Sequence, residues 1–366
     1  MPKPKPQSDT LSRKAARLGD PASTESQMAA IRQLERKLAT AEHNVKAERL
    51  KREYAERELA ERQFSLDTLL ATQDRFTIQK LERLQRKPGG SATAIICAND
   101  WHAEQRVERD IVGGLNEFNL QIASQRVRRL WEKSVYLIDF ARRISNIRDA
   151  VLWLGGDLIN GYIHEELEES NFLGPAEAIM FVQSLVAEGI EYLLANAKLD
   201  SLTVVTNVGN HGRSTKRKRI STGHKTSWEY LAFQNLAARF GTRLKLAFKI
   251  ERGYHNWLDI QGYGVRFHHG DAVQFQGGVG GVHIPLRKKI AQWNKTGRTP
   301  AFDVLGHFHQ YSDDWRYVLC GCLVGYDAYA LSIGAEYQPP TQTFIVVDRQ
   351  YGKVLTAPIF CEDVAK

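Results

Sequence analysis

Aspartate, asparagine and histidine residues gather in five short clusters, each of which directly follows an apolar run and four of which contain a glycine. Their carboxylate, amide and imidazole groups suit Mn²⁺, Fe²⁺ or Zn²⁺ better than Ca²⁺ or Mg²⁺. So many ligands exceed the needs of one catalytic zinc ion, but they suit two ions that share a bridging carboxylate. The clusters are Asn99-Asp100-Trp101-His102, Gly155-Gly156-Asp157, Gly209-Asn210-His211-Gly212-Arg213, His268-His269-Gly270-Asp271 and Gly306-His307-Phe308-His309.

The apolar runs before these clusters predict the strands that position them. The runs are Ala94–Ala98, Ala150–Leu154, Leu202–Val208, Val265–His268 and Phe302–Leu305. Helical periodicity over 115–147 and 175–197 separates the early strands and indicates an α/β layer fold. Ligands of such sheets bind beyond the carboxyl ends of the strands, so we expect the clusters to converge there. Phe344–Val347 and Val354–Ile359 predict a closing hairpin.

The N-terminal quarter has a different composition. Residues 1–24 lack periodicity and predict a flexible tail, whereas 25–87 contain no Gly or Pro and are rich in helix-forming residues. Apolar residues at a spacing of three and four predict a long coiled-coil helix, interrupted at Glu48 and Arg52. Self-association and docking on another protein both remain open. Residues 88–92 predict a linker and 93–366 a catalytic domain. The stripe comprises Ile31, Leu34, Leu38, Ala41, Val45, Ala55, Leu59, Leu66, Leu69 and Phe76.

Composition and charge exclude several classes of protein. The 366 residues are 43% hydrophobic and 25% charged, which excludes a wholly disordered or collagenous chain. We find no apolar run long enough for a membrane span and no secretory signal, and therefore expect no membrane association. The four cysteines predict reduced thiols in the cytoplasm. The first 90 residues carry 19 Lys or Arg and 13 Asp or Glu, and therefore most of the net charge of +8.

The ordered clusters resemble the motifs of the calcineurin-like metallophosphoesterase superfamily, over residues 92–360. The resemblance rests on Asp100-x-His102, Gly156-Asp157 with Gly161, Gly209-Asn210-His211, His269-Gly270 and Gly306-His307-x-His309. The neighbouring phrases are most similar to a branch found in bacteriophage and prophage genomes. The resemblance implies a four-layer αββα sandwich, preceded here by the long coiled-coil helix.

The resemblance also implies a role for each matching residue. His211 would be a proton donor or charge stabiliser beside the scissile phosphate, and Asp157 would bridge two metal ions. Mn²⁺ is the expected metal, with Fe²⁺, Zn²⁺ or Ni²⁺ as alternatives. Asp100, His102 and His309 would hold the first ion, and Asn210, His269 and His307 the second.

Two departures from the family pattern stand out. Gly212 and Arg213 follow His211 where the family usually has an acidic residue that orients the histidine, so the tautomer of His211 is left open. Cys320-Gly321-Cys322 replaces the Asn-Gly-Ser-like turn that commonly follows the last motif.

The function implied is hydrolysis of phosphate esters by a metal-activated hydroxide. We favour a phosphodiesterase or nuclease acting on DNA or RNA, because a run of basic residues follows His211 and could hold flanking phosphates. Alternatives are a phosphomonoesterase acting on proteins or small molecules, and a scaffold protein with a vestigial site. The substrate-binding candidates are Arg213, Lys216, Lys225 and His164.

Overall fold

The computed structural model describes residues 21–73, 89–241, 243–275 and 281–363, with side chains in the first of these ranges described from 25 to 67. Contacts between residues divide the chain into two compact units, Met1–Gln85 and Arg86–Lys366. Each unit is described by itself. The expected stripe positions Leu69 and Phe76 and the expected helical stretch 74–87 lie outside the described side chains or residues.

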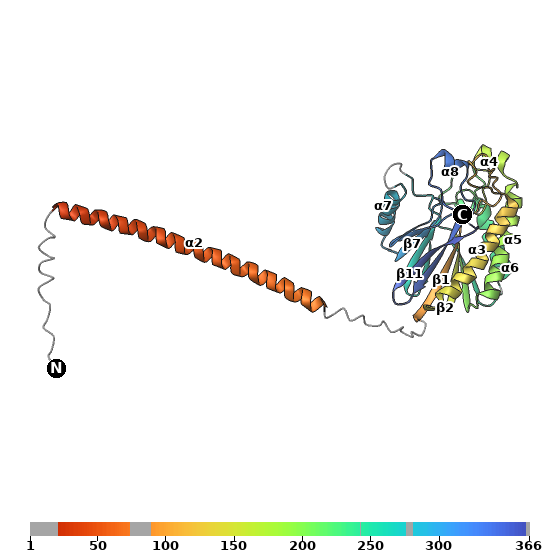
Figure 1. Cartoon of the computed structure of the whole chain (residues 1–366). Coiled ribbons are helices and arrows are strands. Elements are labelled where there is room, and N and C mark those ends of the chain that lie inside the picture. Colours follow the sequence, from red (N-terminus) through yellow and green to blue (C-terminus); the bar gives the residue numbers. More distant parts are fainter. Residues whose placement is uncertain (1–20, 74–88, 242, 276–280, 364–366) are drawn as a thin grey trace. The chain divides into compact units, whose positions relative to one another are not determined.

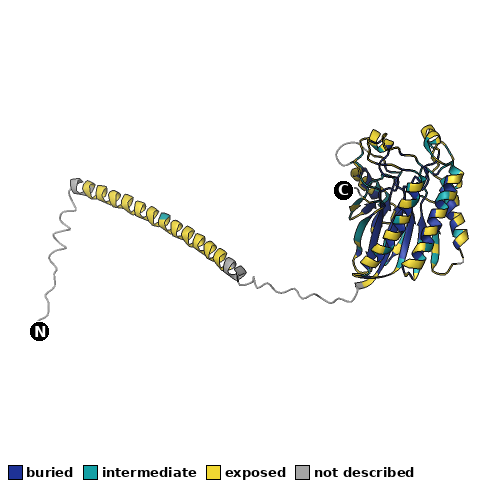
Figure 2. Cartoon of the chain, turned by 45° about the vertical axis from the view of Figure 1, so that its right-hand side comes forward, coloured by how far each residue is buried: buried dark blue, intermediate teal, exposed yellow. Residues whose placement is uncertain are grey.

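The N-terminal unit contains one long helix, α2 (Pro21–Gln73), of 53 residues (Figure 1). It begins earlier than expected, since residues 21–24 belong to the helix and not to the tail. Pro21 explains this start, because proline at the first helical position lacks only a hydrogen bond that would not form there. Figure 2 shows that nearly every described position of α2 is exposed.

The second unit is built on two β-sheets (Figure 1). The first has the strand order β11-β10-β1-β2-β3-β4, with β1 to β4 parallel and β10 antiparallel to β1. Its strands are β1 (Gly89–Ala98), β2 (Ser145–Leu154), β3 (Ser201–Thr206), β4 (Leu246–Ile250), β10 (Thr341–Asp348) and β11 (Gly352–Phe360). The antiparallel pair β10–β11 confirms the expected closing hairpin.

The second sheet has the order β5-β6-β7-β9-β8, and its three central strands are parallel. The strands are β5 (Asn256–Ile260), β6 (Tyr263–His268), β7 (Phe302–Leu305), β8 (Ser312–Asp314) and β9 (Tyr317–Leu319). All five strands that were expected to carry the polar clusters are therefore present, two in this sheet and three in the first.

Successive side chains of a strand point to opposite faces of the first sheet, so the same strand contributes to two apolar layers, one on each face. In β1, Ile95 and Cys97 pack between the sheets, whereas Ala94 and Ile96 face the helices outside the first sheet. Those helices are α3 (Leu120–Ala141), α5 (Pro175–Asn196) and α6 (Trp228–Phe240). On the second sheet, α7 (His283–Asn294) packs through Leu286 and Ile290. The result is the expected four-layer αββα sandwich, with its buried strands shown in Figure 2.

Several boundaries differ from the expectation. The glycines of the expected linker 88–92 begin β1 instead, because Gly89 pairs with Ser145 of β2, and Ala92 already pairs with Asp348 of β10. The helix expected over 115–147 is α3 alone, and Ser145–Ile147 starts β2. Three short helical segments complete the described elements of this unit: α4 (Glu165–Ser170), α8 (Ala328–Ser332) and the 3₁₀ turn η1 (Gly223–Thr226).

The expectations about the cysteines and about membrane spans can be compared with the described structure. All four cysteines are free and buried, while the cytoplasmic location stays a prediction.

By length and composition α5 is apolar enough to cross a membrane, with a mean hydropathy of 1.4 over its most apolar window. Half of that window is buried, and Val182, Val186 and Ile190 lie in the core beside the first sheet. Such burial is typical of a core helix.

Candidate metal centre

The predicted ligands share an unusual backbone conformation. Eight described residues other than glycine have positive φ, and five of them are predicted metal ligands with φ between +44° and +74°. Left-handed backbone is costly for side chains with a Cβ, and such residues cluster at functional sites. The chain therefore turns sharply at the strand ends and aims these side chains at one region. The five residues are Asp100, His102, Asp157, His307 and His309.

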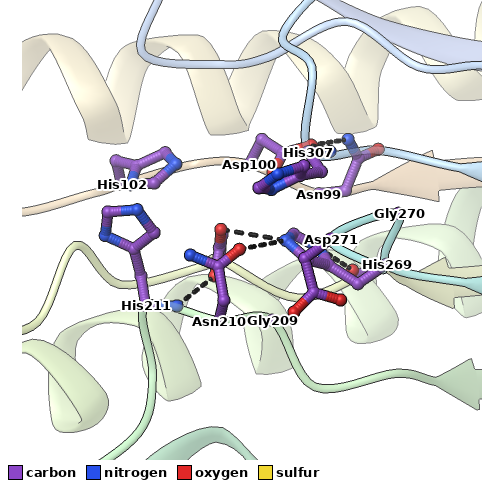
Figure 3. A network of polar contacts seen from close by, with 12 residues as sticks. Asn99, Asp100, His102, Gly209, Asn210, His211, His269, Gly270, Asp271 and His307 are labelled. Carbon is purple, nitrogen blue, oxygen red and sulfur yellow. Dashed lines mark hydrogen bonds and ion pairs between the residues drawn. The ribbon is translucent and has the colours of Figure 1, made fainter. Parts of the chain in front are cut away.

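Close approach of two backbones fixes the turn that carries Asp157. Gly156 has a φ of +87°, and a Cβ at this position would lie 2.2 Å from the backbone nitrogen of Gly209. The loops after β2 and β3 therefore touch directly, which brings Asp157 against the loop of Asn210 and His211. The backbone N–H of His211 donates to Oδ1 of Asp157 at 2.7 Å. Figure 3 shows the side chains of this region facing one another.

Asp100, His102 and His309 form the first candidate ligand group, with donor atoms within 4.8 Å of one another. This is the set expected for the first ion. Nε2 of His309 lies 3.1 Å from Nε2 of His102 and 3.9 Å from Oδ1 of Asp100. That Oδ1 atom is buried and has no hydrogen-bond partner. A cation would satisfy all three atoms at once.

A chain of amides fixes the proton on His102. Asn171 donates through Nδ2 to the carbonyl oxygen of Gly161, so its Oδ1 accepts from Nδ2 of Asn160. The remaining Oδ1 of Asn160 lies 2.9 Å from Nδ1 of His102 and must accept the proton of that nitrogen. Burial lowers the pKa of His102 well below its usual value. His102 is therefore neutral and presents a lone pair at Nε2, which is the form that binds metal.

Asp157, His269 and His307 form the second candidate group, also within 4.8 Å. Nδ1 of His269 donates to the carbonyl oxygen of Gly155 at 2.9 Å. Its Nε2 then faces two oxygens, Oδ2 of Asp157 at 3.0 Å and Oδ1 of Asn210 at 3.1 Å. Six of the seven predicted ligands thus fall into the two groups, and Asn210 contacts the second. The bridging role of Asp157 stays a prediction.

The electrostatics of the site favour added positive charge. Burial by itself lowers the pKa of His269, but Asp157 raises it well above its usual value. Burial raises the pKa of Asp157 and neighbouring His269 lowers it, with a net value well below the usual one. Against burial, Cys322 and Asp100 raise the pKa of His309 to about 10. Protons are thus held where divalent cations would bind, and the donor set fits two such ions.

Two buried glutamates brace the ligand loops, and the sequence analysis missed both. Oε1 of Glu104 accepts the backbone N–H groups of Asn160 and Gly161, both at 2.8 Å. Glu229, on α6, accepts from the N–H groups of Leu158 and Gly209, both at 2.7 Å. Glu229 therefore ties the loop after β2 to the loop after β3. Each glutamate lies far along the chain from the loops it braces, which is why motif spacing does not reveal it.

Glu229 also explains the glycine that follows His211. A Cβ on Gly212 would lie 2.6 Å from Cγ of Glu229, so no side chain fits there. The acidic residue that the family usually has after the histidine is absent here, because position 212 is a glycine. The carboxylate of Glu229, from α6, lies beside this glycine. Burial raises the pKa of Glu229 to about 8, with a further contribution from Asp157.

His211 lies at the edge of the first ligand group. Its ring centroid is 4.7 Å from that of His102, and the two rings are nearly perpendicular at 88°. Nδ1 of His211 donates to the carbonyl oxygen of Asn160 at 2.9 Å, which leaves Nε2 as the free nitrogen. The tautomer that the sequence left open is therefore defined by this hydrogen bond. Burial lowers the pKa of His211.

The four predicted substrate-binding residues occupy different surroundings. Arg213 donates to the backbone carbonyl oxygens of Asn210 and Thr215, so its guanidinium shapes the loop. Lys216 and Lys225 are exposed, and Nζ of Lys216 lies 4.0 Å from the exposed Glu165. His164 is exposed, and its ring centroid is 6.5 Å from that of His211. Their roles in substrate binding stay predictions.

Another lysine of the same basic run lies against the site. Lys218 forms an ion pair with Asp271, and its Nζ is 5.2 Å from the ring centroid of Tyr254. Asp271 follows the predicted ligand His269 by two residues and is nearly buried, whereas the lysine side chain is 42% exposed. The signal in the sequence was the run itself, but nothing in it singled out Lys218.

His268 points away from the ligands, as alternation along a strand predicts. The preceding Phe267 packs between the sheets, whereas the His268 ring lies 4.9 Å from that of Trp293 on α7. Arg266 lies over the same Trp293 ring and forms two hydrogen bonds with buried Asp303 at 2.5 and 3.0 Å. His268 is therefore part of the packing beneath α7.

Comparisons with solved structures find distant likenesses. Vps29 from Entamoeba histolytica, complexed with Zn²⁺, is 9% identical with a TM-score of 0.31, over 73% of this chain and 99% of that one. A putative 5′-nucleotidase from Staphylococcus aureus is 11% identical with a TM-score of 0.28, over 75% and 55%. SoxB, a sulfate thiohydrolase from Thermus thermophilus, is 10% identical with a TM-score of 0.29, over 76% and 59%. No family model and no curated protein matches significantly.

Proposed function

We propose that the chain is a metal-dependent phosphoesterase of the calcineurin-like kind, which hydrolyses phosphodiester bonds in DNA or RNA. One observation carries the proposal: two groups of carboxylate and imidazole donors, from four separate strand ends, lie within coordinating reach. Two divalent ions bound there would supply a nucleophile at neutral pH and offset the charge that develops on the phosphate.

The residues of the chain have separate tasks in this proposal. Asp100 and Asp157 would supply the negative charge that holds the cations, and the four histidines would complete the donor sets. Manganese is the metal we favour for this mixed set, with iron, zinc and nickel as alternatives. Because Nδ1 of His211 donates its proton to the carbonyl oxygen of Asn160, Nε2 is the atom that would first take up a proton from the attacking water or from solvent and then give it to the leaving oxygen.

The preference for a nucleic acid rests on the basic loop that follows His211. The loop carries four consecutive basic residues, 216–219, and its Lys218 pairs with Asp271 two residues beyond the ligand His269. The positive side chains of this loop suit the phosphates that flank a scissile diester. Tyr162 is 38% exposed and close in sequence to His164, and its ring offers a surface for a base. A small phosphomonoester would need none of these groups.

The test compares substrates that differ in one feature. Purified protein with Mn²⁺ is assayed on bis-p-nitrophenyl phosphate, p-nitrophenyl phosphate, and labelled single- and double-stranded DNA and RNA. We expect turnover of the diester and of at least one nucleic acid, and its loss in the Asp157→Asn variant. Turnover of the monoester alone would replace the proposal with a phosphomonoesterase. No turnover with Mn²⁺, Fe²⁺, Zn²⁺ or Ni²⁺ would favour a scaffold with a vestigial site.

A further inference from the structure

The long helix α2 exposes an apolar stripe in the part of the chain that the structure describes. The larger side chains of the stripe are between 54% and 68% exposed, and Figure 2 shows no covered face along the helix. A helix with such a stripe gains most of its stability by packing the stripe against a partner. These side chains are Ile31, Leu34, Leu38, Val45, Leu59 and Leu66.

The stripe repeats every seven residues, and its residue types indicate two strands. The first core position of the heptad holds Ile31, Leu38, Val45, Arg52, Leu59 and Leu66. The second core position holds Leu34, Ala41, Glu48, Ala55 and Arg62. Branched Ile31 and Val45 at the first position, with Leu34 at the second, favour a parallel pair of helices over larger bundles.

Charges beside the stripe match those of a second copy in the parallel orientation. In a parallel pair, the residue before the first core position faces the residue five places further along the other helix. Lys37 thereby faces Glu42 of the second copy, and Lys51 faces Glu56 of the second copy. Lys51 also contacts Glu48 in its own helix at 3.2 Å, but that pair is more than 70% exposed and holds the lysine weakly.

The polar interruption at Glu48 and Arg52 sets the alignment. In a parallel, in-register pair these residues occupy adjacent core layers, so each carboxylate can reach the guanidinium of the other copy. Sliding one helix by a heptad would place them against apolar residues, Ala41 or Val45 on one side and Ala55 or Leu59 on the other. An antiparallel pair that joins Glu48 to Arg52 would bring Glu42 beside Glu56 of the second copy, which is repulsive.

We propose that residues 25–67 of α2 bind the same segment of a second copy of this chain, as a parallel, in-register, two-stranded coiled coil. We assign a second copy as the partner because Lys37 and Lys51 lie opposite glutamates of the same segment when the helix pairs with itself. The pairing is independent of the phosphoesterase proposal, and it would place two catalytic units on one particle.

Cysteine cross-linking of the full chain tests the orientation. In Val45→Cys the new thiols face each other across the core, so mild oxidation should convert most of the protein to covalent dimer. Ala47→Cys, on the outer side of the helix, is the matched control and should stay monomeric on a denaturing gel. The native cysteines are buried and leave the background low. Cross-linking only in a mixture of Val45→Cys and Ala55→Cys would instead show an antiparallel pair and overturn the proposal.

Reversing the charges beside the stripe tests whether the partner is a second copy of this chain. The double variant Lys37→Glu/Lys51→Glu and the double variant Glu42→Lys/Glu56→Lys should each dissociate at micromolar concentration, and their equimolar mixture should form a heterodimer. Light scattering of the full-length wild type should give twice the mass of one chain. A monomeric wild type, or two variants that stay dimeric alone, would overturn the proposal. Circular dichroism of each variant checks that the helix remains formed.

Discussion

Nε2 of His102 lies 3.1 Å from Nε2 of His309, although 207 residues separate them along the chain. The proton of His102 is on Nδ1, where Asn160 accepts it, so its Nε2 presents a lone pair. Two ring nitrogens at this distance need a proton or a cation between them. The unpaired, buried Oδ1 of Asp100 lies on the same side, 3.9 Å from the nitrogen of His309. The arrangement is therefore suited to a metal ion.

Removing the amide that orients His102 should weaken metal binding. In Asn160→Ala the ring loses the acceptor at Nδ1, so both its tautomer and its orientation become free. Groups of this kind change metal affinity by about 10- to 100-fold. Titration with Mn²⁺ should show that loss at one of two sites. Asn196→Ala, which removes a surface amide on α5, is the control and should bind as the wild type does.

Replacing His211 should separate turnover from metal binding. His211→Gln removes the nitrogen that would carry a proton, and the expected loss in kcat is roughly a hundredfold to ten-thousandfold. Metal content should stay that of the wild type, because His211 belongs to neither ligand group. If the variant lost its metal together with its activity, His211 would be a ligand and the assignment would be wrong.

The buried carboxyl of Glu229 should make stability depend on pH. Burial raises its pKa to about 8, above the ordinary value of 4.5, so the folded state favours the protonated form. The contribution of the Glu229 carboxyl to the free energy of unfolding is complete below about pH 4.5 and is lost as the pH rises toward 8. The limiting slope of this free energy is about 1.4 kcal/mol per pH unit.

Urea unfolding of metal-free protein at pH 5 and pH 8 measures this dependence. The wild type should lose stability with rising pH relative to Glu229→Gln, which does not titrate. Glu188→Gln, on the exposed side of α5, should follow the wild type. Parallel pH profiles for all three proteins would show that Glu229 does not titrate in this range.

Lys218 should matter for long substrates more than for short ones. Its ion pair with Asp271 holds it beside the ligand loop, where it could contact a phosphate next to the scissile one. Lys218→Ala should raise KM for single-stranded DNA several-fold and leave kcat/KM for bis-p-nitrophenyl phosphate nearly unchanged. Lys225→Ala serves as the matched comparison in the same loop. Equal losses on both substrates would place Lys218 in the support of the metal site and not in substrate contact.

The sequence predicts the strands and their polar ends well, because both follow from local patterns. A strand that is buried on both faces, such as Ala94–Ala98, appears in the sequence as a continuous apolar run. The polar cluster that follows each run is also contiguous in the sequence. Boundaries are less predictable, since Gly89 and Gly90 resemble a linker until their pairing with β2 is known. The two sheets also require β4, β5, β8 and β9, whose short or weakly apolar sequences carry little signal.

The groups that support the site lie beyond sequence reasoning for a physical reason. Glu229 contacts the N–H of Gly209 across 20 residues, and only the packing of α6 against the sheet brings them together. Arg213 is a second case: its position beside His211 predicts a phosphate contact, which stays a prediction, while its hydrogen bonds to backbone carbonyl oxygens could not be foreseen from the sequence. Proximity in sequence identifies which residues are near a site, but hydrogen bonding decides what each one does.

The metal content of the purified protein tests the central claim most directly. Elemental analysis of the wild type after loading with Mn²⁺ should give two ions per chain. Asp157→Asn should lose most of that metal, whereas Asp139→Asn, on the surface of α3, should retain both ions. A wild type that binds no divalent ion, or an Asp157→Asn variant with unchanged metal content, would contradict the two-metal site.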